Sequence, residues 1–145
     1  MRFFLISILL WVGATAASAA PVCRNWDGSP AKAEGYIVSY VFEINPQDRV
    51  NSRGVALNDA LALIQQDRAN MHRFNAPGYL DEWDSFFTEL DQRSMISNAD
   101  LRTFCGANVP DLESMMIDAR YNNAFIVDVF QESGRLVLFV SVMAG

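Results

Sequence analysis

The sequence is poor in the residues from which small metal and catalytic sites are usually built. It has a single histidine, His72, and only two cysteines, Cys23 and Cys105. One histidine excludes paired-histidine metal sites such as H-E-x-x-H, and the cysteines form no C-x-x-C pair. A G-x-S-x-G turn, a glycine-rich phosphate loop and an EF-hand calcium loop are also missing. We therefore predict no cofactor and no metal site, and we expect binding rather than catalysis.

Long hydrophobic runs are also scarce, and the strongly apolar stretch lies at the N-terminus. Arg2 precedes ten mostly apolar residues, 3–12, and small residues follow as far as Ala20. Together with an A-x-A pattern at 17–19, this order is typical of a secretory signal peptide, and we predict cleavage after Ala19 or Ala20. The alternative is an uncleaved anchor, but ten residues are too few for a bilayer that needs roughly 20. We expect a periplasmic or secreted protein with no stable membrane insertion after cleavage.

Basic residues are outnumbered by acidic ones. Loss of Arg2 with the leader leaves ten basic residues against seventeen acidic ones, so the formal net charge of −6 becomes −7. Such a domain repels phosphate backbones, which argues against binding to nucleic acid or to anionic membranes. A protein partner with a cationic surface would complement this charge. The alternative is that the charge serves solubility alone.

The mature chain has the size of one domain. Removal of residues 1–19 leaves 126 of the 145 residues, enough for a single hydrophobic core. Residues 20–34 are rich in turn formers and predict an irregular N-terminal arm, and residues 35–145 predict one α+β domain. Cys23 and Cys105 lie 82 positions apart, and in an oxidising compartment we expect a disulfide that ties the arm to the domain. A redox pair is the alternative.

Hydrophobic periodicity predicts three strands. Residues 35–44 alternate between two faces, as expected of a strand. Residues 124–130 and 135–143 are β-branched and aromatic, and the residues between them predict a hairpin turn in which Gly134 takes a positive φ. The hairpin is apolar on both faces. Either helices cover both faces, or one face is left for a partner, or the strand is simply central and buried.

Four helices are predicted in the middle of the chain, over residues 55–73, 79–92, 98–105 and 110–120. Because neither a lone strand nor a lone hairpin is stable, we expect the strands to join. The predicted fold is therefore α+β: a small, mainly antiparallel three-stranded sheet, made of the N-terminal strand and the C-terminal hairpin, packed by about four helices.

His72 is the centre of the one catalytic hypothesis. In it, His72 acts as a base, and either Asp67 or an acidic residue elsewhere in the chain orients the imidazole. Asp67 and His72 are five positions apart, about 140° around a helix, so they do not face each other. Arg68, the i−4 neighbour of His72, would also disfavour its protonation. The alternative is a solvated helix end whose positive charge suits the helix dipole.

The predicted helix 79–92 carries an acidic segment in which Asp81, Glu82 and Asp84 are candidate partner contacts. A helix would splay these carboxylates, so a calcium site is not predicted. Three functional hypotheses remain open. The first is a non-catalytic exported interaction protein: an inhibitor, an immunity-type antagonist or an accessory subunit. The second is a small hydrolase or lyase built around His72, and the third is a carrier of a small apolar ligand.

Overall fold

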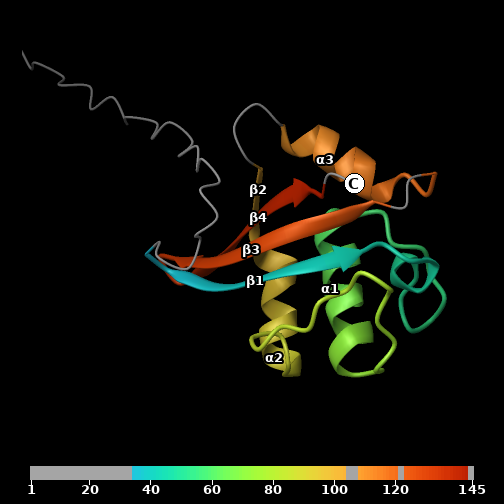
Figure 1. Cartoon of the computed structure of the whole chain (residues 1–145), viewed down its shortest axis with the longest axis horizontal. Helices are drawn as coiled ribbons and strands as arrows, with labels where there is room; N and C mark the ends of the chain where they lie inside the picture. Colours follow the sequence, from blue (N-terminus) through green and yellow to red (C-terminus); the bar gives the residue numbers. More distant parts are fainter. Residues whose placement is uncertain (1–33, 104–107, 121–122, 144–145) are drawn as a thin grey trace, which may run out of the picture.

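The protein is an α+β fold built on one open, four-stranded mixed sheet (Figure 1). The computed structural model describes residues 34–103, 108–120 and 123–143. Its elements, in chain order, are β1 (Tyr36–Glu43), the 3₁₀ turn η2 (Pro46–Arg49), α1 (Ala60–His72), α2 (Leu90–Ser94), the 3₁₀ turn η3 (Met95–Asn98), β2 (Asp100–Thr103), α3 (Val109–Ile117), β3 (Ala124–Glu132) and β4 (Arg135–Val142). The predicted leader 1–19, most of the predicted arm 20–34 and both cysteines lie outside the described residues.

The predicted strands are confirmed, and the sheet gains a fourth. The strand order is β1-β3-β4-β2, with β1 and β4 antiparallel to β3 and β2 parallel to β4. Glu132 pairs with Arg135, so the hairpin turn has two residues, Ser133 and Gly134. Both have positive φ, 48° and 81°, which is the backbone twist that a tight antiparallel hairpin requires. The sheet ends at β1 on one side and at β2 on the other.

One face of the sheet carries the main hydrophobic core. Alternate residues of β3, among them Phe125 and Val127, are buried against Leu63 and Ile64 of α1. The 3₁₀ turn η3 and the helix α3 contribute to the same cluster, and Figure 1 shows α1 and α2 on one side of the sheet. None of the described helices has both the length and the apolar character that crossing a bilayer requires.

The opposite face carries a smaller apolar cluster made of Phe130, Val137 and Phe139, with Tyr36 packed against it. The first three side chains are at most 4% exposed. Both faces of the hairpin are therefore buried, as its two-faced apolar pattern indicates, and neither is an open patch at these positions.

Two of the four predicted helices are confirmed with shorter bounds. The first begins at Ala60 rather than Val55, because Asp59 accepts a hydrogen bond from the N–H of Ala62 and caps it there. The last spans Val109–Ile117, and Pro110 lies in its first turn, as the predicted start at residue 110 implies. Its N-cap is Asn108, whose side chain accepts a hydrogen bond from the N–H of Asp111.

The other two helix predictions are wrong. Residues 79–89 form an irregular segment, and only Leu90–Ser94 is helical. Short aspartate side chains in this segment bind nearby backbone N–H groups, which competes with helix formation. The predicted helix 98–105 is replaced by β2 over its described part, because the exposed edge of β4 offers a parallel ladder to these residues.

Candidate functional site

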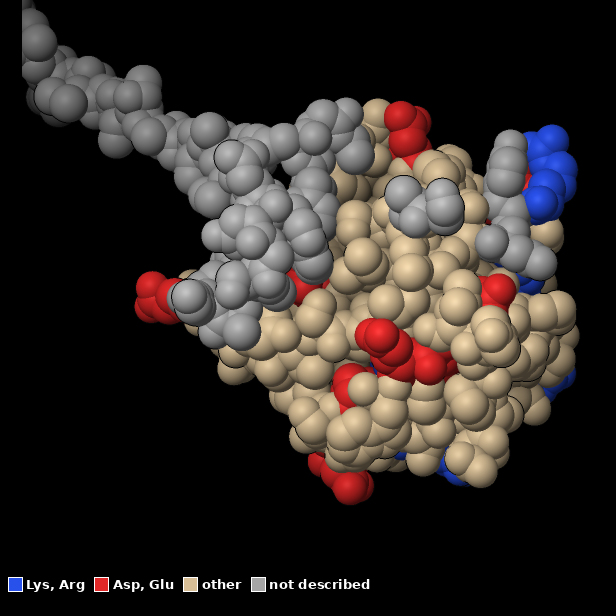
Figure 2. Space-filling model, in the orientation of Figure 1, with Lys and Arg blue, Asp and Glu red and all other residues tan. Residues whose placement is uncertain are grey.

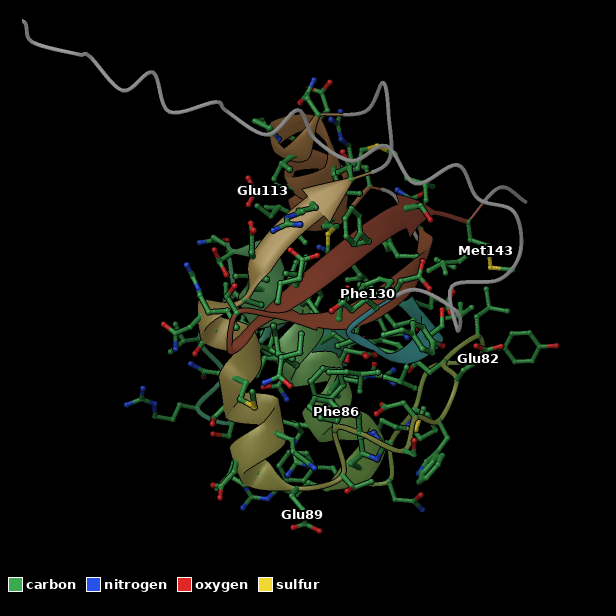
Figure 3. All side chains as sticks on the ribbon, turned by 90° about the vertical axis from the view of Figure 1, so that its left-hand side faces the viewer. Glu82, Phe86, Glu89, Glu113, Phe130 and Met143 are labelled. Atoms are coloured by element: carbon green, nitrogen blue, oxygen red, sulfur yellow. The ribbon has the colours of Figure 1, made fainter. Side chains whose placement is uncertain are left out.

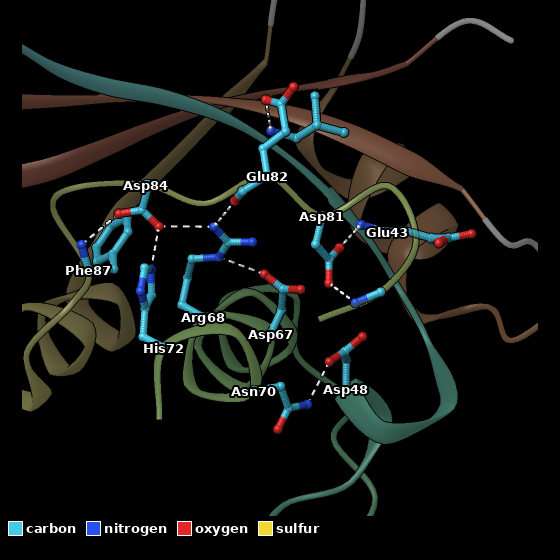
Figure 4. A network of polar contacts seen from close by, with 12 residues as sticks. Glu43, Asp48, Asp67, Arg68, Asn70, His72, Asp81, Glu82, Asp84 and Phe87 are labelled. Carbon is cyan, nitrogen blue, oxygen red and sulfur yellow. Dashed lines mark hydrogen bonds and ion pairs between the residues drawn. The ribbon is translucent and has the colours of Figure 1, made fainter. Parts of the chain in front are cut away.

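His72, the last residue of α1, forms a buried pair with Asp84 and not with Asp67 (Figure 4). Its Nε2 lies 2.7 Å from Oδ2 of Asp84, and the side chain is 3% exposed. The separation of Asp67 and His72 around the helix is thus as predicted. The acidic partner lies elsewhere in the chain, which the sequence left open, but Asp84 could not be singled out because it was predicted to lie on a separate helix.

Arg68 lies between two carboxylates in the protein interior. Its Nε donates to Asp67 at 2.7 Å, and its Nη1 donates to Asp84 at 2.9 Å and to the carbonyl oxygen of Glu82 at 2.9 Å. The guanidinium carbon lies 4.0 Å from the ring centroid of Tyr40. All three charged side chains of the two ion pairs are 0% exposed. The reading of this helix end as a solvated face is therefore wrong for Arg68 and His72.

The charges in this cluster are set by burial and hydrogen bonding. Burial alone would raise the pKa of Asp84, but hydrogen bonds from Phe87 N–H, His72 and Arg68 outweigh it and hold the pKa below its usual value. Burial raises the pKa of Asp67 well above its usual value, with Arg68 opposing. Arg68 contacts both carboxylates directly, and this pairing lowers the cost of burying the three groups in a low dielectric.

The cluster fixes the segment between α1 and α2, residues 74–89, which we call the strap. The buried Phe87 and the half-buried Phe86 donate their backbone N–H groups to Oδ1 of Asp84, at 2.6 Å and 2.9 Å. Arg93 of α2 donates to the carbonyl oxygens of Phe87 and Thr88, at 2.8 Å and 2.7 Å. The strap is irregular in conformation, but its backbone polar groups are engaged repeatedly by buried side chains.

The strap also runs along β1, the edge strand of the sheet. The N–H of Glu82 donates to the carbonyl oxygen of Val41 at 2.8 Å, and the N–H of Val41 donates back to Oε2 of Glu82 at 3.0 Å. The N–H of Glu43 donates to Asp81 at 2.7 Å. Carboxylates thus occupy the positions where a neighbouring strand would accept hydrogen bonds, which protects an edge that would otherwise pair with other chains.

The three acidic residues proposed as partner contacts therefore have internal roles. Asp81 binds the N–H groups of Glu43 and Gly78, and Asp84 is 1% exposed within the arginine cluster. Glu82 is exposed, and one of its two carboxylate oxygens accepts a hydrogen bond from the N–H of Val41. Of the three, Glu82 remains the one that faces solvent.

The outer side of the strap carries large apolar side chains that face solvent. Tyr79 is 95% exposed and Trp83 is 64% exposed. The indole of Trp83 packs edge-on against the ring of His72, with centroids 5.8 Å apart. Further large exposed side chains lie on or next to the strap: Phe74, Leu80 and Leu90. Leu80, Trp83 and Leu90 recur at the spacing of a helix, which is why the predicted helix 79–92 implied that they would be buried on one face. The spacing of Gly78, Asp81 and Asp84, which is typical of side-chain-capped turns, was the signal that could have corrected it.

Among the described residues, no three histidine, cysteine, aspartate or glutamate side chains converge in a way that could hold a metal ion. Nor does His72 make a hydrogen bond to a hydroxyl or thiol within the described part of the chain. What the cluster demonstrably does is hold the strap against α1 and β1.

Comparisons with known proteins found no similar protein-family model, curated protein or solved structure. Function is therefore inferred from the geometry.

Proposed function

We propose that this chain is an exported, non-catalytic interaction protein that binds a protein partner through the outer side of the strap. The observation that carries the proposal is a pair of exposed aromatic side chains, Tyr79 and Trp83, on a backbone that buried charges hold in place. Export is supported by the leader-like residues 1–19, and an oxidised Cys23–Cys105 pair would suit that compartment.

The physical argument is the cost of binding. Tyrosine and tryptophan supply large contact areas with few rotatable bonds, and such residues dominate the energy of protein interfaces. A loop that is already fixed loses little entropy when it is bound. Asp84, Arg68 and Asp81 fix this loop before any partner arrives, whereas five large apolar side chains on it or beside it remain open to solvent.

The experiment is affinity capture with matched variants. Mature protein would be immobilised and exposed to the exported proteins of its source cell, and captured proteins would be counted by mass spectrometry. Tyr79→Ser/Trp83→Ser should lower capture of the specific partner by about tenfold or more. Met115→Ser/Val142→Ser removes exposed apolar side chains at α3 and β4 and should leave capture unchanged. Equal capture by both double variants would refute the proposal.

A second candidate, a small hydrolase or lyase centred on His72, has the 2.7 Å contact of His72 with Asp84 in its favour. His72→Gln separates the two functions. If the partner-binding proposal holds, the folded variant keeps its partner, because glutamine still offers an N–H donor to Asp84. A catalytic role would appear as loss of phenotype in a variant that remains folded and still binds.

A further inference from the structure

The strap and the first turn of α2 carry negative charge only. Between Phe74 and Gln92 the sequence has five acidic residues and no lysine, arginine or histidine, and the fifth acidic residue, Asp91, lies in α2. Of the five, Glu82, Glu89 and Asp91 are exposed. Figure 3 shows Glu89 pointing away from the body of the protein at the lower end of this region. The exposed aromatic side chains are thus flanked by carboxylates that point to solvent.

Few of the chain's own cations are placed to neutralise these carboxylates. Arg68 and Arg93 are buried and bind groups inside the fold, and Arg49 donates to the carbonyl oxygens of Met116 and Ile117 at the end of α3. Arg73 is exposed beside the strap, with its guanidinium carbon 5.0 Å from the ring centroid of Phe74. On the face shown in Figure 2, basic side chains lie mostly toward the rim, and acidic ones also occupy the centre.

We propose that the partner presents an arginine-bearing segment to the strap, an inference that rests on the proposed function. One arginine side chain of this segment would lie on the face of Trp83 or Tyr79. Because Glu82 and Glu89 lie well apart (Figure 3), different N–H donors along the segment would reach their carboxylates. Guanidinium groups favour this combination, because they stack on aromatic rings and donate in a planar fork to carboxylates.

The protein already uses this chemistry internally. Arg68 lies over the ring of Tyr40 and donates to Asp67 and Asp84 at the same time. The strap offers the same two kinds of group, aromatic rings and carboxylates, with no internal arginine between Phe74 and Gln92 to occupy them. A second copy of this chain fits poorly, because it would bring the same excess of acidic charge to the contact.

The test uses a displayed library of random 12-residue peptides, selected on mature protein at low ionic strength. The expected peptides carry arginine, and replacing the arginine of the strongest peptide with uncharged citrulline should weaken binding about tenfold. The double variant Glu82→Gln/Glu89→Gln should weaken peptide binding about fivefold or more. It should leave the strap in place, because the amide oxygen introduced by Glu82→Gln can still accept the hydrogen bond from the N–H of Val41. The control Glu34→Gln/Glu113→Gln removes the same number of charges from exposed and half-buried positions off the strap and should have little effect.

The outcomes separate the two proposals. Peptides that need Tyr79 and Trp83 but contain no arginine, or bind equally to Glu82→Gln/Glu89→Gln, would overturn the arginine inference and leave the strap as the binding surface. Peptides that bind Tyr79→Ser/Trp83→Ser as well as the unaltered protein would overturn both. Recovery of no strap-dependent peptide, or self-association abolished by Tyr79→Ser, would also overturn the arginine inference.

Discussion

Replacement of Arg68 by methionine should destabilise the protein strongly and release the strap. Methionine fills much of the same space with an apolar chain, so the main loss is electrostatic. The substitution removes the partner of Asp67 at 2.7 Å and of Asp84 at 2.9 Å, both of them fully buried, and the donor to the carbonyl oxygen of Glu82. Breaking a buried ion pair by removing one partner typically costs about 3–5 kcal/mol.

The expected loss lies near the lower end of that range. Asp67 can take up a proton, because burial already raises its pKa. Asp84 keeps its hydrogen bonds from His72 and from the N–H groups of Phe86 and Phe87. We therefore expect a loss of about 3 kcal/mol in the free energy of unfolding, which lowers the Tm of a domain of this size by about 12 °C or more.

Urea denaturation followed by circular dichroism measures the free energy, and limited proteolysis reports on the strap. Arg73→Met is the matched control, because Arg73 is exposed and stacks on Phe74 without an ion pair to a described residue. It should change stability by less than about 0.5 kcal/mol. If Arg68→Met costs less than about 1 kcal/mol, or cleavage sites stay outside residues 74–89, the cluster does not hold the strap.

Three further predictions concern the backbone, the pH dependence and the cysteines. Gly35→Ala should lower the free energy of unfolding by about 2 kcal/mol in urea denaturation, because the φ of Gly35 is +75° and a Cβ there would collide with the carbonyl oxygen of Gln131. The control Gly54→Ala should lower it less, because Gly54 has a similar φ of +74° but open space around it. Burial raises the pKa of Asp67, so between the unfolded pKa of about 4 and the raised folded pKa the folded state binds more protons than the unfolded state. Stability should fall as pH rises through that window, and Asp67→Asn should flatten the fall; an unchanged slope contradicts the assignment. Peptide mapping of exported protein without reductant should recover Cys23 joined to Cys105, and two free thiols would contradict the predicted disulfide.

The sheet could be predicted from the sequence because its signals are local. Residues 35–44 alternate cleanly, and the hairpin carries β-branched residues around a turn with Gly134. Caps at Asp59 and Asn108 set the starts of α1 and α3 in the same local way. β2 was missed, since four residues with no clear alternation become a strand only when the edge of β4 is present beside them.

The strap could not be predicted because its conformation depends on partners far along the chain. Leu80, Trp83, Phe87 and Leu90 recur at helical spacing, yet only Phe87 is buried. The competing contacts join Asp84 to Arg68 and His72, and Glu82 to Val41, across 12 to 41 positions. The sequence singled out His72 and Arg68, but it offered no means of pairing them with Asp84.

Native-state hydrogen exchange of the strap tests most directly whether it is fixed before binding. The amides to follow are Glu82, which donates to Val41, Phe87, which donates to Asp84, and Val41 itself, which donates to Glu82. If the strap is held as described, these amides exchange as slowly as those of the β3–β4 ladder. Exchange at the rate of an unstructured peptide, in protein whose sheet remains protected, would contradict it.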